Sequence, residues 1–415
     1  MHFSAVLQNG IRIVGQEIPY FHSVSMGVWI ASGSRYEKPA ENGISHYIEH
    51  MLFKGTQTKS ALDISTAMDA VGGQLNAFTG KEETCYYAKV RDAHADLAAE
   101  LLADMLLHSV FDADEQEKEK KVILEELKMS QDDPEDIVND ILFQSLYKKQ
   151  TLGNTVLGTE KNILSFNQQA IAEYMQRRYT PQNIVLSFAG NISCEQAVQI
   201  GNKYFSGLAA PTVKEGAFAN TLVQNEKIII KSKAIEQAHV CVAYPGIAIE
   251  AEDRTALNII SSLYGGSMSS RLFQTVREKH GLAYAVYSYP ISHIGTGCFV
   301  AYAAVKPENT QQVMDIIRDE ATAIYQKGLY SGELERIKEQ FKGSYILAQE
   351  SASAKMNSLG RSTLLLGRVK EEDEILSAID AVTPEKVEFL AQSFLSAPYA
   401  VAVVGPKKRI GALSL

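Results

Sequence analysis

Two histidines and a glutamate lie close together in the stretch SHYIEHMLFKGT, residues 45–56. If this stretch is helical, His46 and His50 are four residues apart and share a face, and Glu49 projects near that face. Zinc favours imidazole nitrogen and carboxylate oxygen, and a catalytic zinc site combines three protein ligands with one open position. The order H-x-x-E-H is that of the inverted zincin motif, in which the glutamate acts as a base and is not a ligand.

The same pattern also fits an ordinary helix that carries two unrelated histidines. The chain has nine histidines, so a chance occurrence of this motif is on the order of one in a hundred. The seven other histidines have no ligand spacing and are interpreted as surface or core residues. A third ligand elsewhere in the chain is needed to decide between a metal site and chance.

A candidate for the third ligand lies in the charged stretch EQEKEKKVILEELK, residues 115–128. Such a stretch usually forms a helix with a solvated face, yet Glu119 and Glu126 are seven apart and share a face with Ile123. Glu125 lies instead on a face rich in lysine. A carboxylate beside buried aliphatic side chains is costly unless it is compensated, which zinc would do. We therefore predict Glu126 as the ligand and Glu119 as the residue that orients a ligand.

The elements that must position these residues follow from hydrophobic periodicity. Alternating or short apolar runs predict strands at residues 23–32, 85–90, 183–190, 238–246, 283–290, 297–305 and 399–405. A period near 3.6 predicts helices at residues 43–54, 60–71, 94–108, 114–130, 134–147, 254–264, 269–279, 308–327, 332–349 and 384–394.

The order of elements occurs twice along the chain, at an offset near 215 residues. The segment CYYAKV ending at Val90 matches AYAAV ending at Val305, and the strand that ends at Gly190 matches the one that ends at Gly405. Strands and helices mix without strict alternation, which predicts an α+β fold with two homologous domains. Each is expected to be a mostly antiparallel sheet with helices on one face. We place the domains at 1–210 and 221–415, joined by a linker at 207–220.

Composition excludes several classes of protein. The chain has 415 residues, 46% hydrophobic, and a net charge of −9 without a basic run, which argues against nucleic-acid binding. No apolar stretch approaches the roughly 18 residues that span a membrane. The four cysteines form no C-x-x-C pair, and the first residues do not form a signal peptide, so we expect a cytoplasmic protein. A chain already trimmed of a presequence is the alternative.

These residues resemble the pitrilysin, insulin-degrading enzyme and mitochondrial processing peptidase group of inverted-motif zinc peptidases. In that pattern one glutamate follows the second histidine by about 76 residues, and a second glutamate precedes the first glutamate by seven. Glu126 and Glu119 occupy these two positions here. HYIEHMLFKGT, GGQLNAFTGKEETCYYAKV and TPQNIVLSFAGN also resemble the family. The resemblance covers essentially the whole chain, and the length is similar to that of the processing-peptidase branch. It implies one Zn²⁺ per chain.

The resemblance also implies residues that bind the substrate. GGQLNAFT alone indicates only a turn and a strand, but the matching family segment pairs with an extended peptide. Asn76 and Ala77 are then candidate backbone contacts and Phe78 a candidate pocket wall. Arg277 and Tyr284, by themselves a surface arginine and a strand tyrosine, resemble the family pair that binds the substrate carbonyl and stabilises the oxyanion.

The function implied is a zinc-dependent endopeptidase that hydrolyses extended peptides or unfolded segments, with Glu49 as general base. The resemblance further implies a homodimer in which Arg277 and Tyr284 serve the zinc of the other protomer in a shared chamber. The alternative is a non-catalytic scaffold or peptide-binding subunit of a larger complex, and a weaker one is a heterodimer. The sequence SHYIEHMLFKGT is complete in the metal motif, which favours the enzyme.

Overall fold

The computed structural model describes residues 2–208, 220–223, 227–396 and 400–415, which group into two compact units. The first unit holds residues 2–128, 154–208 and 347–369, and the second holds the remaining described residues. Neither unit is a continuous half of the chain, because each contains a segment from the other half. The domain boundaries expected from the sequence stay a prediction, and the expected linker at 207–220 lies mostly outside the described residues.

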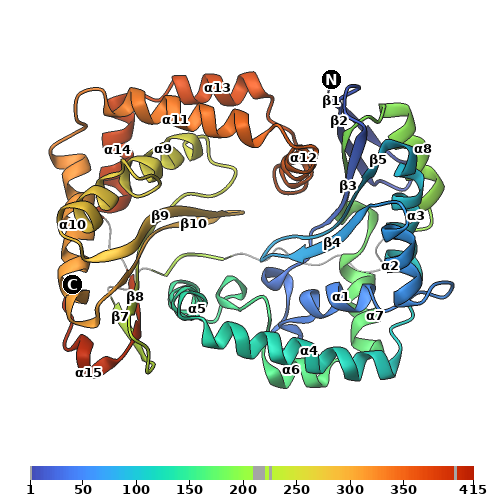
Figure 1. The fold of residues 1–415 in the computed structure, drawn as a ribbon, viewed down its shortest axis with the longest axis horizontal. Helices are drawn as coiled ribbons and strands as arrows, with labels where there is room; N and C mark the ends of the chain where they lie inside the picture. The colour runs from blue at the N-terminus through green and yellow to red at the C-terminus, as the bar shows by residue number, and fades with distance from the viewer. Residues whose placement is uncertain (1, 209–219, 224–226, 397–399) are drawn as a thin grey trace. The chain divides into compact units, whose positions relative to one another are not determined.

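The first unit is built on a six-stranded sheet with the order β1-β2-β6-β3-β5-β4. Its strands are β1 (His2–Val6), β2 (Arg12–Glu17), β3 (Ser23–Ile30), β4 (Gln74–Thr79), β5 (Thr84–Arg91) and β6 (Ile184–Gly190). All neighbours pair antiparallel except β2 and β6, which are parallel. Strand β4 therefore lies at the edge of the sheet (Figure 1).

Successive side chains of β3 point to opposite faces of the sheet, and each face belongs to a different hydrophobic core. Val24, Met26 and Val28 join the larger core, together with side chains from the helices of that face. These helices and their neighbours are α1 (Ile44–Leu52), α2 (Ala61–Asp69), α3 (Ala95–His108), α4 (Ala113–Asp132), α6 (Glu160–Ser165), α7 (Gln168–Arg178) and α8 (Cys194–Phe205). Trp29 points to the other face. The period of two thus determines which residues of β3 meet which layer.

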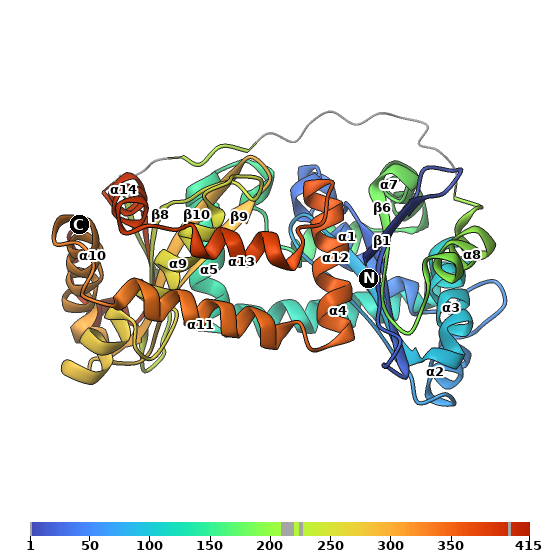
Figure 2. The same ribbon diagram turned by 90° about the horizontal axis from the view of Figure 1, so that it is seen from above.

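A helix from the second half of the chain covers the other face of this sheet. Helix α12 (Ala352–Leu366) packs on β6 and β3 (Figure 2), and its Met356 and Leu359 join Trp29 in a second core. Gly360 allows a close approach, because a Cβ atom there would lie 2.2 Å from Trp29 Nε1. The prediction of helices on one face is therefore incomplete, since this sheet has helices on both faces.

The second unit repeats the arrangement with a five-stranded sheet of order β7-β11-β8-β10-β9. Its strands are β7 (Lys227–Ser232), β8 (Ala238–Pro245), β9 (Ala283–His293), β10 (Thr296–Val305) and β11 (Ala400–Gly405). The helices of this unit are α5 (Pro134–Tyr147), α9 (Arg254–Tyr264), α10 (Thr310–Gln326), α11 (Glu333–Ala348), α13 (Glu372–Asp380), α14 (Pro384–Leu395) and α15 (Lys407–Ile410). Here α5, from the first half of the chain, packs on β8 and β11.

Five strands of each sheet correspond in order, β2-β6-β3-β5-β4 to β7-β11-β8-β10-β9, and β1 has no counterpart among the described strands. Among the described strands, each sheet has one parallel pair, β2 with β6 and β7 with β11, and the other pairs are antiparallel. The expected α+β fold of two homologous, mostly antiparallel sheets is confirmed. Within the described part of the chain, no helix is both long and apolar enough to cross a membrane.

Candidate metal centre

Helix α1 turns its apolar side into the core and its polar side toward α4. Tyr47, Ile48 and Met51 are completely buried in the larger core of the first unit. Because 3.6 residues complete a turn, burial of these positions leaves His46, Glu49 and His50 on the opposite side of the helix.

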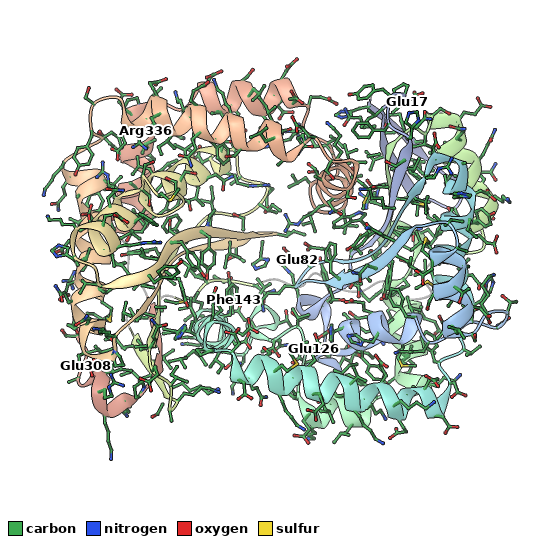
Figure 3. The ribbon with its side chains drawn as sticks, in the orientation of Figure 1. Glu17, Glu82, Glu126, Phe143, Glu308 and Arg336 are labelled. Carbon is green, nitrogen blue, oxygen red and sulfur yellow. The ribbon has the colours of Figure 1, made fainter. Side chains whose placement is uncertain are left out.

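Helix α4 supplies the third group of the site. Ile123 is completely buried in the larger core. Glu126, three residues further along α4, lies on the side of this helix that faces α1 (Figure 3). Glu126 Oε2 lies 3.6 Å from His46 Nε2 and 3.5 Å from His50 Nε2. The potential ligand atoms of these three residues all lie within 4.8 Å of one another. Glu125, which the sequence analysis set aside, lies at the surface and pairs with Lys128 at 2.6 Å.

The burial of the two α4 glutamates differs from the sequence-based argument. The Glu126 side chain is 43% exposed, whereas the Glu119 side chain is only 6% exposed. Burial beside aliphatic side chains therefore describes Glu119 better than Glu126. The position of Glu126 opposite both imidazoles, rather than its burial, makes it the candidate ligand.

Glu119 holds His50 in one orientation. His50 Nδ1 donates to Glu119 Oε1 at 2.8 Å, which leaves Nε2 directed at Glu126. Lys54, at the end of the same motif, approaches the other oxygen, Oε2 of Glu119, at 2.6 Å. A carboxylate that fixes the tautomer of a histidine ligand is the usual second layer of a metal site. Lys54 was not predicted from the sequence, although it lies within residues 45–56.

The pKa values of the two histidines are shifted in opposite directions from the ordinary value of histidine. Burial and the charge of His50 lower the pKa of His46 to about 4, so His46 is neutral at pH 7. Burial acts in the same downward direction on His50, but hydrogen bonds with Glu119 and Glu126 raise its pKa to about 9. The bond with His50 keeps the pKa of Glu126 below its usual value, with burial opposing. Glu126 is therefore ionised and faces a protonated His50. A divalent cation bound here would replace the proton of His50.

Glu49 lies beside the ligand groups and close to the edge strand. Burial raises its pKa, and a hydrogen bond from Thr79 Oγ1 to Glu49 Oε2, at 2.5 Å, opposes the rise. A carboxyl group with a raised pKa is suited to accept and release a proton near neutral pH. Thr79 was also missed, because it contacts Glu49 from a strand that is distant in sequence.

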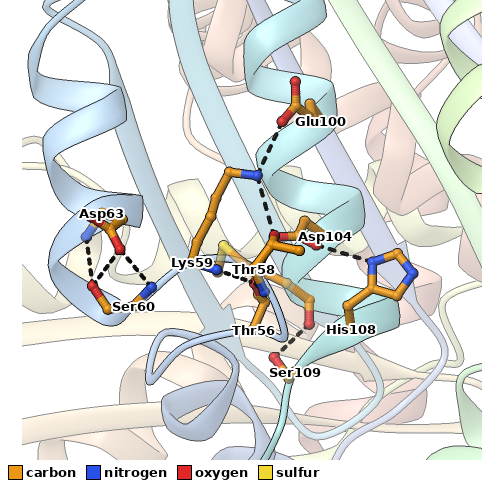
Figure 4. Close-up of polar contacts among 10 residues, drawn as sticks. Thr56, Thr58, Lys59, Ser60, Asp63, Glu100, Asp104, His108 and Ser109 are labelled. Carbon is orange, nitrogen blue, oxygen red and sulfur yellow. Dashed lines mark hydrogen bonds and ion pairs between the residues drawn. The ribbon is translucent and has the colours of Figure 1, made fainter.

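The loop after α1 is fixed by polar contacts to α3 (Figure 4). Thr56, the last residue of the motif, donates to Asp104 Oδ2 at 2.7 Å and accepts from the backbone of Lys59. Lys59 pairs with Glu100 at 3.1 Å, and Ser60 begins α2 in a reciprocal cap with Asp63. The loop at the C-terminal end of α1 is therefore anchored to α3 through the buried Thr56 and the largely buried Asp104 and Lys59.

The residues fit a zinc ion in both donor chemistry and arrangement. Two imidazole nitrogens and one carboxylate oxygen converge, and one histidine is oriented by a carboxylate. Catalytic zinc sites with two histidines and one glutamate have this composition.

Strand β4 brings the predicted substrate contacts to a free edge of the sheet. Among the described residues, no strand pairs with the outer edge of β4, which contains Asn76 and Ala77. Thr79 faces Glu49, whereas Phe78 points to the other face and contacts the Trp29 ring edge-on at 5.5 Å. Phe78 is thus on the opposite side of the strand from the proposed base.

A cavity of about 590 Å³ adjoins the other end of this strand. It is open to solvent, and its apolar wall is formed by Phe53, Ile64, Met68 and Leu75. Its position beside a free strand edge suits a side chain of a bound peptide.

Arg277 and Tyr284 lie together in the second unit. Arg277 Nη1 donates to the Tyr284 carbonyl at 3.2 Å, and its guanidinium stacks 4.7 Å from the Tyr284 ring. The Tyr284 side chain is 78% exposed. The helix expected at 269–279 is in large part π-helical, at η6 (Phe273–Lys279). A π-helical turn at this place agrees with the frequent use of such turns at functional sites.

Comparisons with known proteins relate both halves of the chain to one family. Residues 12–160 match the family described as "Insulinase (Peptidase family M16)", and residues 165–341 match "Peptidase M16 inactive domain". The chain belongs to peptidase family M16. The resemblance expected from H-x-x-E-H and the two spaced glutamates is confirmed.

Individual relatives cover nearly the full length. The chain is 45% identical to "Uncharacterized zinc protease YmxG" of Bacillus subtilis, over 96% of this chain and 97% of that one. It is 40% identical to an uncharacterized zinc protease of Streptomyces coelicolor, over 97% and 89%. The crystal structure of a Helicobacter pylori protease shares the fold, with a TM-score of 0.91 at 20% identity over 98% and 99% of the two chains.

Proposed function

We propose that this M16 chain is a zinc-dependent endopeptidase that hydrolyses extended peptides or unfolded segments. The convergence of His46, His50 and Glu126 on one point carries the proposal. Relatives named as zinc proteases over nearly the same length support it.

Zinc in this site would supply a Lewis acid that polarises the scissile carbonyl and acidifies the attacking water. Glu49 takes the proton of that water and passes it to the leaving amine. Its raised pKa suits both halves of this transfer. Thr79 holds the Glu49 carboxylate toward the edge strand by the hydrogen bond at 2.5 Å.

The peptide substrate would bind as an added strand along β4. Main-chain bonds to Asn76 and Ala77 would hold any extended sequence, and the cavity between Met68 and Leu75 would take one side chain. Phe78 would act indirectly, by packing the strand against Trp29. Pairing along β4 requires an extended chain, so peptides and unfolded segments are the expected substrates.

The second domain would supply the donors for the oxyanion. Arg277 and Tyr284 present a guanidinium and an exposed phenol side by side, and such groups stabilise developing negative charge. We propose that they serve the site of a second protomer in a homodimer. A cytoplasmic location stays a prediction from the use of the four cysteines.

Zinc content separates this proposal from the scaffold alternative. Purified protein is expected to contain about one zinc per chain, to lose peptide cleavage on chelation, and to regain it with added zinc. Elemental analysis beside cleavage of a quenched fluorescent peptide measures both. Zinc well below one per chain that added metal does not restore, without cleavage, would favour the scaffold.

A further inference from the structure

The N-terminus of α1, the helix that carries His46 and His50, has no side-chain cap at its N-cap position. Gly43 is the N-cap of α1, with φ of 99°, and no side chain caps the first turn from this position. A Cβ atom there would lie 2.8 Å from the Leu157 carbonyl oxygen and 2.9 Å from Gly158 Cα. The position therefore excludes the serine, threonine or aspartate whose oxygen usually accepts the first free N–H groups of a helix.

Glu37, six residues before Gly43, supplies the missing acceptor. Its side chain is completely buried. Glu37 Oε2 accepts from the backbone N–H of Gly43 at 2.7 Å, and Oε1 accepts from that of Ser45 at 2.9 Å. The Asn42 side chain adds a third donor at 3.0 Å to Oε2. A carboxylate at this end of a helix is also favoured by the helix dipole.

The neighbours of Glu37 are arranged as donors. Burial raises the pKa of Glu37, while the bonds from Gly43, Ser45 and Asn42 lower it. Both carboxylate oxygens are used by N–H groups, so the ionised form satisfies every bond. Ser45 in turn bonds the buried Tyr174 hydroxyl at 2.8 Å, which ties the same turn to α7.

The two histidine ligands depend on different supports. His50 is oriented by Glu119 through Nδ1. The buried Nδ1 of His46 has no hydrogen-bond partner among the described residues. The place of the His46 ring therefore depends on its backbone and on packing, including an edge contact to His50 at 4.6 Å. His46 directly follows Ser45, whose amide Glu37 holds.

We propose that Glu37 is a positioning residue of the metal centre. By bonding the amides of Gly43 and Ser45 it fixes the first turn of α1 and so the place of His46 Nε2 opposite Glu126. This inference rests on the proposed zinc site, and it assigns the site a support outside the H-x-x-E-H motif.

The test measures zinc affinity and the visible spectrum of the cobalt-substituted protein for Glu37→Gln. Glutamine keeps the size of the side chain but turns an N–H against one of the two amides. Zinc is expected to bind about tenfold to a hundredfold more weakly, as for other residues that support metal ligands. The cobalt absorption bands are expected to shift because His46 is displaced.

Glu333→Gln is the matched control. Glu333 is also a buried carboxylate at the start of a helix, accepts the N–H of Tyr330 at 2.9 Å, and lies in the second unit. Both variants are expected to melt at a lower temperature, but Glu333→Gln should bind zinc and absorb as the wild type does. An equal loss of zinc affinity in Glu333→Gln would overturn the proposal.

Glu37→Asp provides a second reading, which decides alone if Glu37→Gln does not fold. Aspartate keeps the charge but is one methylene too short to hold both amides, so an intermediate zinc affinity is expected. Wild-type affinity and an unchanged cobalt spectrum in either folded variant would refute the role of Glu37. Failure of the wild-type chain to bind zinc would instead refute the proposed function.

Discussion

At the scale of single residues, the two histidines of the candidate metal centre share a helix face but differ in pKa. His50 is bonded to two carboxylates and has a pKa of about 9, whereas burial lowers the pKa of His46 to about 4. At pH 7 only His50 holds a proton that zinc must displace. Lys54 and Glu119 together keep His50 aligned, so this proton is lost from a ring already in position.

This difference predicts how zinc affinity depends on pH. The proton competes with zinc for His50 below a pH of about 9, so the apparent dissociation constant should rise about tenfold for each pH unit lost between pH 8 and 6. His46 adds no further dependence in this range. Titration against a chelator, corrected for the chelator's own protonation, measures the slope.

The control for this slope is His94→Gln, since His94 has no ligand spacing and lies away from the motif in sequence. It should leave the dependence unchanged. A flat affinity between pH 6 and 8 in the wild-type chain would show that His50 is neutral there.

At the scale of elements, each sheet depends on a helix from the other half of the chain. Helix α12 covers Trp29 in the first unit, and α5 covers Cys241 and Cys298 in the second. The close fit of α12 depends on Gly360, which contacts the indole ring. The sheet that supports the metal helix therefore needs residues 352–366 to cover its second face.

This contact predicts the effect of Gly360→Ala. The added Cβ atom would meet Trp29 Nε1 at 2.2 Å, and overpacking of this kind lowers the free energy of unfolding by roughly 1–3 kcal/mol. Gly343→Ala in α11 is the matched change, because no atom lies within 4 Å of its Cβ position. It should be neutral or raise stability by up to about 1 kcal/mol. Denaturant unfolding compares the two, and equal effects would contradict the packing account.

Some elements could be predicted from sequence and others could not, for physical reasons. Strands β3, β6, β8 and β10 have strong apolar patterns and were expected within a few residues of their bounds. Helix α12 was not predicted, because its buried face follows a helical period but includes small and polar residues such as Ala352, Gly360 and Thr363, which weaken the hydrophobic signal. Strands β1 and β7 were not predicted either: β1 is the short, partly exposed HFSAV, and β7 is KIIIKS, whose apolar run is too short to distinguish a strand from a helix by periodicity.

The candidate site divides in the same way. Spacing along helices indicated His46, His50, Glu119 and Glu126, because all four share helix faces. Thr79, Lys54 and Glu37 act through partners on other elements or across an irregular turn, which no periodicity reveals. Sequence therefore predicts the candidate ligands and Glu119, whereas the contacts of Thr79, Lys54 and Glu37 require the fold.

At the scale of the whole molecule, we propose a homodimer whose two protomers share their active sites. Mixing Glu49→Gln with Arg277→Ala should test this, since each variant alone lacks one essential group. If the groups act across the dimer, a mixed dimer holds one complete site. About a quarter of wild-type activity is then expected after subunit exchange.

An active site formed within one chain predicts a different result for the mixture. If Glu49 and Arg277 act within one chain, every site in the mixture lacks a group, and activity should stay at the level of the single variants. Refolding the two variants together, followed by the peptide cleavage assay, distinguishes these cases. Wild-type protein refolded in the same way provides the reference.

Glu49→Gln on its own tests whether Glu49 is the general base beside a bound zinc ion. The variant keeps His46, His50 and Glu126, so it should bind about one zinc per chain. Without the carboxylate that accepts the water proton, peptide cleavage should fall about 10³-fold or more. Zinc content and cleavage rate are measured on the same sample. Full zinc content with nearly complete loss of cleavage is the predicted result, and wild-type cleavage by the zinc-loaded variant would show that Glu49 is not the general base.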